Sequence, residues 1–153
     1  MEEIKVEQFE YRTSRSPNEL YSGGLGPCIA MGAIYGKKGY MFHAPPVGHA
    51  FSTHIEPIFR DLRKDVKDKN RLQIYVVGGE IEVNDEYKGE KLAGRQTVLD
   101  KIVQSGFEKC VKEVRWCLPN YNQELRLILL EGRAEIDEFD ERDEFLEDDY
   151  GMS

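Results

Sequence analysis

The chain has 153 residues, of which 40% are hydrophobic, and its net charge is −8. This length and composition suffice for one hydrophobic core and predict one domain. No run of about eighteen apolar residues occurs, and the N-terminus lacks the order of a secretory signal, so we expect a cytoplasmic protein without membrane insertion. Three cysteines are too few and too unevenly spaced for a disulfide framework, which indicates reduced thiols.

The negative charge is concentrated at the C-terminus. Residues 137–153 hold nine acidic residues and one base, so residues 1–136 carry no net charge. We predict a folded domain over 1–136 and a solvated, disordered acidic tail over 137–153, because self-repulsion and low apolar content oppose folding. Neither part has the basic face that nucleic acid requires. An alternative for the tail is docking in a basic partner groove through Phe139, Phe145, Leu146 and Tyr150.

The first third of the chain predicts strands around a glycine-rich turn. In residues 4–9 apolar and polar residues alternate loosely, which indicates a half-buried strand. Residues 11–18 are polar, which indicates a loop. Residues 28–35 form a nearly continuous apolar run, and a Gly-Lys-Lys-Gly turn joins it to residues 40–43. This pattern predicts a hairpin of buried strands.

The remaining chain predicts alternating helices and strands. Thr53 and Glu56 have the spacing of a capping box at the start of an amphipathic helix that ends near Lys69. Two glycines, Gly78 and Gly79, end the next strand. The other expected elements are a polar loop over 84–91, a helix over 94–106, and strands over 72–77, 114–118 and 125–130.

A cysteine and a histidine occupy positions typical of a nucleophile and its base. Cys28 directly follows the glycine-rich stretch Ser22-Gly23-Gly24-Leu25-Gly26-Pro27, where few side chains shield it and backbone N–H groups can approach an oxyanion. His43 ends the second strand of the predicted hairpin, so the two residues should lie near the same edge of the sheet. An imidazole titrates near neutral pH and could accept the thiol proton.

These motifs, followed by Pro45-Pro46, resemble CheD, the chemoreceptor glutamine deamidase family. Later features over about residues 20–132 fit the same pattern: Val77-Gly78-Gly79, the helix opening Leu92-Ala93-Gly94-Arg95-Gln96, and a final strand pair. The resemblance implies an α/β fold: a three-layer α/β/β sandwich of mixed, mostly antiparallel strands with two helices. It also implies a cysteine–histidine–threonine site, shared with deamidating toxins of the cytotoxic necrotizing factor type.

By position, the resemblance assigns Cys28 as nucleophile, His43 as general base, and Ser22 to the threonine that orients the histidine. Pro27 stands where the family usually has serine and has no N–H, so the oxyanion donors would be the backbone groups of Gly26 and Cys28. The implied activity is hydrolysis of a protein glutamine to glutamate through a thioester, with glutamyl methyl esters as a second substrate and no cofactor. The implied partners are the substrate protein and a CheC-type phosphatase or a receptor.

Other interpretations of these residues remain open. The changes at Ser22 and Pro27 would also fit a catalytically weak or inactive CheD-like binding module. Cys28 and His43, with His49 and His54, could bind zinc, but their separations match no compact ligand pattern. Most free cysteines are small buried core residues, which is our expectation for Cys110 and Cys117. His43 alone would more often be a satisfied core histidine.

Overall fold

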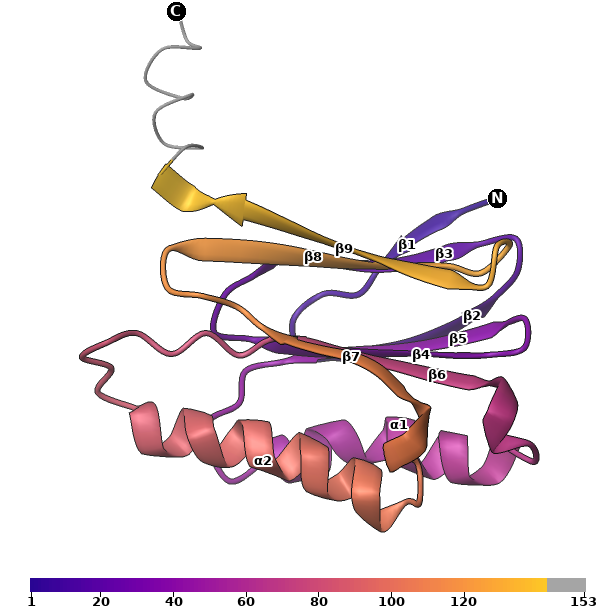
Figure 1. Cartoon of the computed structure of the whole chain (residues 1–153), viewed down its shortest axis with the longest axis horizontal. Helices are drawn as coiled ribbons and strands as arrows, with labels where there is room; N and C mark the ends of the chain where they lie inside the picture. The colour runs from indigo at the N-terminus through magenta and orange to yellow at the C-terminus, as the bar shows by residue number, and fades with distance from the viewer. Residues whose placement is uncertain (143–153) are drawn as a thin grey trace, which may run out of the picture.

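The computed structural model describes residues 1–142 as three layers: a four-stranded sheet, a five-stranded sheet and a pair of helices (Figure 1). The strands are β1 (Glu3–Lys5), β2 (Glu10–Arg15), β3 (Glu19–Leu25), β4 (Ile29–Tyr35), β5 (Lys38–Ala44), β6 (Leu72–Gly78), β7 (Val111–Trp116), β8 (Tyr121–Ile128) and β9 (Arg133–Asp140). The helices are α1 (Phe51–Asp65) and α2 (Lys88–Gln104), and short 3-10 turns cover Lys69–Arg71 and Glu108–Cys110.

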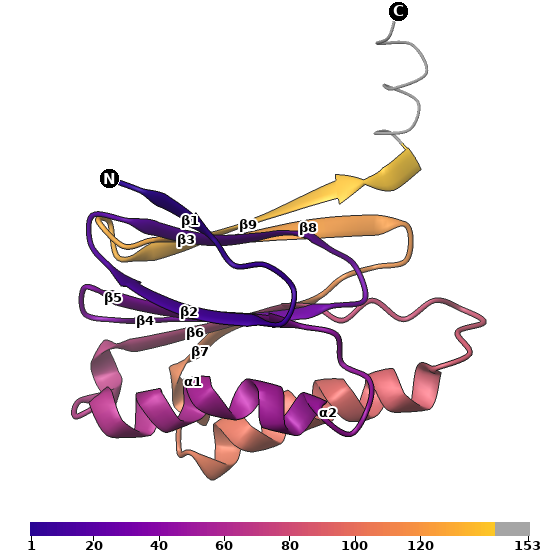
Figure 2. The same ribbon diagram turned by 180° about the vertical axis from the view of Figure 1, so that it is seen from behind.

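The two sheets have the strand orders β1-β3-β8-β9 and β2-β5-β4-β6-β7. Among the strands of residues 1–142, the β1–β3 and β6–β7 pairs are parallel, and the other pairs are antiparallel. The five-stranded sheet is the middle layer, with the helices on one face and the other sheet on the opposite face (Figure 2). The predicted α/β fold with two helices and mixed, mostly antiparallel sheets is therefore confirmed.

Two apolar clusters hold the layers together, because alternate residues of the middle strands point to opposite faces. Met31, Phe42 and Val76 face the helices, whereas Ala30, Met41 and Val77 face the other sheet. A strand buried on both faces reads as a continuous apolar run, which is why the sequence predicted the β4–β5 hairpin correctly.

Two tyrosine hydroxyl groups hold α1 on the middle sheet. The Tyr11 hydroxyl donates to Asp61 at 2.6 Å, and the Tyr40 hydroxyl donates to Asp65 at 2.7 Å. Lys38 also donates to Asp65, at 2.9 Å. The hydrogen bonds from Lys38 and Tyr40 lower the pKa of the Asp65 carboxyl below its usual value. These contacts attach the C-terminal half of α1 to β2 and to the beginning of β5.

Several predicted boundaries are wrong. Strands β2 and β3 occupy the segment that was expected to be a loop. The capping box is also wrong: α1 begins at Phe51, and its N-cap, Ala50, makes no side-chain cap. Helix α2 begins at Lys88, inside the predicted polar loop.

The last strand, β9, runs to Asp140 and so extends beyond the predicted domain boundary at 136. Residues 143–153, with Phe145, Leu146 and Tyr150 of the predicted tail, lie outside the described residues. Within residues 1–142, neither helix is long and apolar enough to cross a membrane.

Two glycines of α2 predict opposite responses to the same substitution. A Cβ at Gly94 would lie 2.5 Å from the Cβ and carbonyl oxygen of Pro46, whereas a Cβ at Gly89 would meet nothing within 4 Å. Alanine in an exposed helix position is favoured over glycine by about 0.5–1 kcal/mol, and overpacking costs about 1–3 kcal/mol. Gly89→Ala should therefore raise the free energy of unfolding in urea, and Gly94→Ala should lower it. Equal changes at both positions would contradict the close approach of α2 to Pro46.

Candidate functional site

Cys28 and His43 lie at the same end of the middle sheet. Between Ser22 and Leu25 the register of β3 with β8 shifts, which marks a β-bulge, and Gly24 within it has a φ of 63°. A bulge bends its strand and re-aims the residues that follow. Here it carries the chain from the four-stranded sheet into the turn that precedes β4, where Cys28 lies.

The two side chains also belong to the same face of that sheet. His43 lies directly opposite Ala30 in the β4–β5 pair, and Cys28 precedes Ala30 by two residues. Both Cys28 and Ala30 pack against the apolar cluster between the sheets. Cys28 is thus a diagonal neighbour of His43, a relationship that corresponds to a separation of about 7–8 Å. No hydrogen bond to the Cys28 Sγ occurs among residues 1–142.

The backbone carbonyl of Val6 receives contacts from both other site residues. His43 Nδ1 lies 3.2 Å from this oxygen, and the Ser22 hydroxyl donates to it at 2.8 Å. A carbonyl only accepts, so Nδ1 carries the proton in this contact and Nε2 of the neutral ring holds the lone pair. The structure thus brings Ser22 and His43 to the same atom, the carbonyl oxygen of Val6.

Burial determines the ionisation of the pair. Cys28 is half-buried, and desolvation raises the pKa of its thiol. His43 is 8% exposed. Desolvation lowers the pKa of its imidazole, against opposing effects from the Val6 carbonyl and Glu7. Both shifts favour uncharged groups, so the resting pair is a thiol and a neutral imidazole with a free Nε2.

The end of β6 supports the turn that carries Cys28. The Gly79 N–H donates to the Cys28 carbonyl at 2.9 Å, and the Glu80 N–H donates to the Gly26 carbonyl at 2.8 Å. Gly78 has a φ of 87°, and a Cβ there would lie 2.0 Å from the Cys28 carbonyl oxygen. Only glycine allows this approach, which explains the glycine pair after β6.

A buried glutamine joins the two sheets behind this turn. Gln123 of β8 is fully buried, accepts from the Gly78 N–H at 2.7 Å and donates to Glu138 at 2.9 Å. Glu80 is 8% exposed and accepts from the Asn120 N–H at 2.9 Å. Burial raises the pKa of the Glu80 carboxyl. Together these contacts fix the turns around Cys28.

The two backbone N–H groups that are predicted to be oxyanion donors make no hydrogen bond within residues 1–142. Within the described chain, the N–H groups of Gly26 and Cys28 are in no hydrogen bond, although the carbonyls of both residues accept one. An unpaired N–H group next to a nucleophile is what a developing oxyanion needs. Pro27 between them has no N–H.

The other candidate residues lie elsewhere. Cys110 and Cys117 are buried, as predicted, and bond to the carbonyls of Lys69 and Tyr121. Burial raises the pKa of both thiols, that of Cys117 to about 12. No group of three or more His, Cys, Asp or Glu side chains in residues 1–142 is arranged to hold a metal ion.

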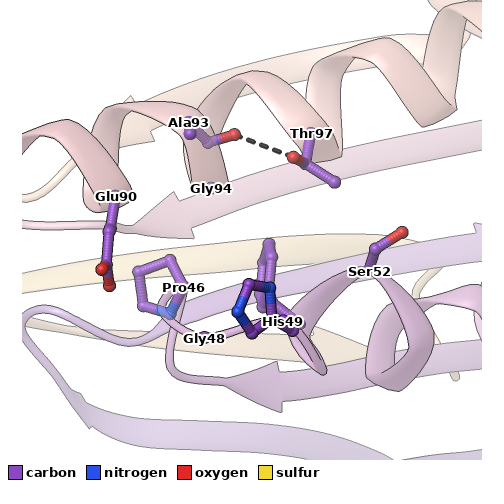
Figure 3. Close-up of a pocket in the computed structure, with 9 residues that line it drawn as sticks. Pro46, Gly48, His49, Ser52, Glu90, Ala93, Gly94 and Thr97 are labelled. Carbon is purple, nitrogen blue, oxygen red and sulfur yellow. Dashed lines mark hydrogen bonds between the residues drawn. The ribbon is translucent and has the colours of Figure 1, made fainter.

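A separate cavity of about 250 Å³ lies between the first turns of α1 and α2 (Figure 3). Its lining includes Pro46, His49, Ser52, Glu90 and Thr97, but neither Cys28 nor His43. Thr97 bonds to the Ala93 carbonyl within its own helix. The cavity lies on the helix side of the middle sheet, so it is not the pocket of the cysteine–histidine pair.

Sequence reasoning missed three groups around the pair: the Val6 carbonyl, Gln123 and Glu80. A backbone carbonyl is present at every residue and gives no signal. Gln123 and Glu80 are polar residues whose burial depends on how the sheets stack. The glycine pair at Gly78 and Gly79 was the only local signal for a close approach of backbone to Cys28.

Comparison with known proteins adds no family assignment. No protein-family model matches the chain, and a search of curated proteins finds no relative. The likeness to CheD therefore stays a prediction from the sequence motifs.

The ionisation of His43 can be measured directly. Its pKa, lowered by burial, predicts a neutral imidazole at pH 7 that becomes protonated only below the usual range of a histidine. Nitrogen-detected NMR at pH 7 should show the proton on Nδ1, because Nδ1 contacts the Val6 carbonyl. A ring that stays charged at pH 7, or one protonated on Nε2, would contradict the geometry.

Proposed function

We propose that this chain is a cysteine-dependent amidohydrolase that converts a glutamine side chain of a protein into glutamate. The observation that carries the proposal is the placement of Cys28 and His43 on one face at one end of the sheet, with Nδ1 turned to the Val6 carbonyl. This orientation leaves Nε2 as the base. The order of the three layers also agrees with the fold that the CheD resemblance implies.

The chemistry runs in two halves. His43 Nε2 takes the thiol proton as Cys28 Sγ attacks the amide carbon, and the N–H groups of Cys28 and Gly26 hold the oxyanion. The imidazolium then donates its proton to the departing ammonia and leaves a thioester. Water, deprotonated by His43, hydrolyses the thioester, which gives glutamate and the free thiol. A glutamyl methyl ester would react in the same way, with methanol as the leaving group.

General-base catalysis suits this site better than a preformed ion pair. Burial disfavours the thiolate and the imidazolium at rest, so the proton moves only as the substrate arrives. Catalytic hydrogen bonds are often long before the substrate binds. The diagonal separation of Cys28 and His43 fits this expectation, since no hydrogen bond joins them in the resting structure.

A test is to incubate the protein with glutamine-containing peptides and to measure ammonia release together with amide-to-acid conversion by mass spectrometry. Cys28→Ala should abolish both, because the nucleophile is gone. His43→Ala should lower the rate by about 10²–10⁴-fold. Ser22→Ala should cause a smaller loss, because His43 keeps its contact with the Val6 carbonyl.

Cys110→Ala is the matched control, since it removes a buried thiol far from the site, and it should leave the rate unchanged. Conversion that persists in Cys28→Ala would refute the proposed nucleophile.

A second candidate, a CheD-like binding module without activity, is favoured by the raised pKa of Cys28 and by the unbonded Sγ. The two functions differ in one readout. An enzyme converts a glutamine of the protein that Cys28→Ala captures. A binding module binds that protein equally well as the wild-type chain and as Cys28→Ala, and it leaves the glutamines of the protein intact.

A further inference from the structure

Arg95 of α2 binds the turn that follows β6, and the same turn holds Cys28. The Nε and Nη2 atoms of Arg95 both donate to the Gly79 carbonyl, at 2.9 and 2.6 Å. Figure 1 shows the loop after β6 leading to the first turns of α2 at this end of the middle sheet. Arg95 therefore ties the helix layer to the segment that supports the nucleophile.

The contact continues through one peptide group to the residues around Cys28. The Gly79 carbonyl and the Glu80 N–H belong to the same peptide group, and this N–H donates to the Gly26 carbonyl at 2.8 Å. The Gly79 N–H donates to the Cys28 carbonyl at 2.9 Å. A donor that binds the carbonyl of a peptide group polarises the group and strengthens the hydrogen bond made by its N–H. The charge of Arg95 thus strengthens the bond to Gly26, two residues before the nucleophile.

The charge of Arg95 has no counter-ion in the described part of the chain. The side chain is half-buried, and within residues 1–142 it pairs with no carboxylate. Burial lowers the pKa of its guanidinium, which still carries its charge at neutral pH. A half-buried charge without a carboxylate costs free energy, and a neutral side chain would fill the same space without that cost. The structure directs this charge to the backbone that holds the Cys28 turn.

An aromatic ring keeps the guanidinium in this place. The guanidinium carbon of Arg95 lies 4.9 Å from the ring centre of Trp116, which is opposite Gly78 in the β6–β7 pair. A Cβ at Gly79 would lie 2.9 Å from the same ring. The ring and the Gly79 carbonyl together form a site for one guanidinium group. Trp116 is the single tryptophan of the chain, so its fluorescence reports whether that site is filled.

We propose that Arg95 is a positioning residue of the cysteine–histidine site, and that it holds the Cys28 turn in its reactive geometry through the Gly79–Glu80 peptide group. This inference rests on the proposed deamidase function and adds to it a residue outside the reacting groups. The hydrogen bonds of Arg95 go to the backbone of the turn and not to Cys28 or His43. Arg95 therefore acts on the rate of the chemical step rather than on substrate binding.

The test measures deamidation of a glutamine peptide by Arg95→Ala and Arg95→Lys. Arg95→Ala should lower kcat by at least about 10-fold and leave KM unchanged, because a displaced nucleophile slows the chemistry while the substrate still binds. Arg95→Lys keeps the charge but lacks the fork of donors, so its kcat should lie between those of Arg95→Ala and the wild type. Arg95→Lys serves for the same comparisons if Arg95→Ala does not fold.

Chemical rescue separates positioning from a loss of stability. Ethylguanidinium at low millimolar concentration should restore part of the kcat of Arg95→Ala and leave the wild-type kcat unchanged, because it fills the empty site beside Trp116. Trp116 emission should change in Arg95→Ala and return toward the wild-type spectrum at the same concentrations. A merely destabilised protein would gain nothing from a guanidinium salt.

Arg71→Ala is the matched control. Arg71 also lies over an aromatic ring, that of Tyr35 at 5.7 Å, but at the opposite end of the middle sheet. This variant should keep the wild-type kcat and should gain nothing from ethylguanidinium. A wild-type kcat in Arg95→Ala, or a loss of kcat that ethylguanidinium does not reverse, would overturn the inference.

A second measurement does not depend on deamidation. The rate of Cys28 alkylation by iodoacetamide at pH 7 should be lower in Arg95→Ala than in the wild type, rise with ethylguanidinium, and stay unchanged in Arg71→Ala. If this result is obtained and no peptide is deamidated, the positioning role stands and the proposed function fails. Deamidation with equal kcat and equal alkylation rates in Arg95→Ala and the wild type would refute the role of Arg95 and leave the enzyme proposal intact.

Discussion

The carbonyl of Val6 is the contact on which the candidate site depends. One oxygen accepts from the Ser22 hydroxyl and meets Nδ1 of His43, so it ties the four-stranded sheet, the linker and the middle sheet together at one atom. Because a carbonyl cannot donate, it also decides which ring nitrogen keeps the proton. In many hydrolases a carboxylate or amide side chain orients the histidine. Here a backbone carbonyl contacts the ring, and the same linker donates the Phe9 N–H to the His43 carbonyl.

The position of Cys28 follows from a second constraint, the close approach of three backbone segments. The bulge in β3 turns the chain toward the middle sheet, and the N–H groups of Gly79 and Glu80 bind the turn from the side of β6. Gly78 allows the approach because it has no Cβ. The carbonyls of Gly26 and Cys28 thereby accept hydrogen bonds from the end of β6, and within residues 1–142 the N–H groups of both residues make none.

The sequence predicted the features that depend on local pattern. The apolar runs of β4 and β5 and the spacing of apolar residues in α1 are visible without the structure. The hairpin also predicted that Cys28 and His43 lie near the same edge of the sheet. Strand β2 was missed because it is an edge strand whose mostly exposed residues are polar. Strand β3 was missed because its glycines form a bulge, which resembles a loop in sequence. Helix α1 begins without a capping side chain, so the spacing of Thr53 and Glu56 does not mark its first residue.

The central claim is that His43 acts as the base for Cys28, and the rate of Cys28 alkylation by iodoacetamide as a function of pH tests it most directly. We expect the wild-type rate to rise with a group that titrates below pH 6.5 and then to level off, because neutral His43 removes the thiol proton. In His43→Ala the rate at pH 7 should be at least about tenfold lower and should rise only at alkaline pH, as the thiol itself ionises. Identical profiles for the two proteins would contradict the account.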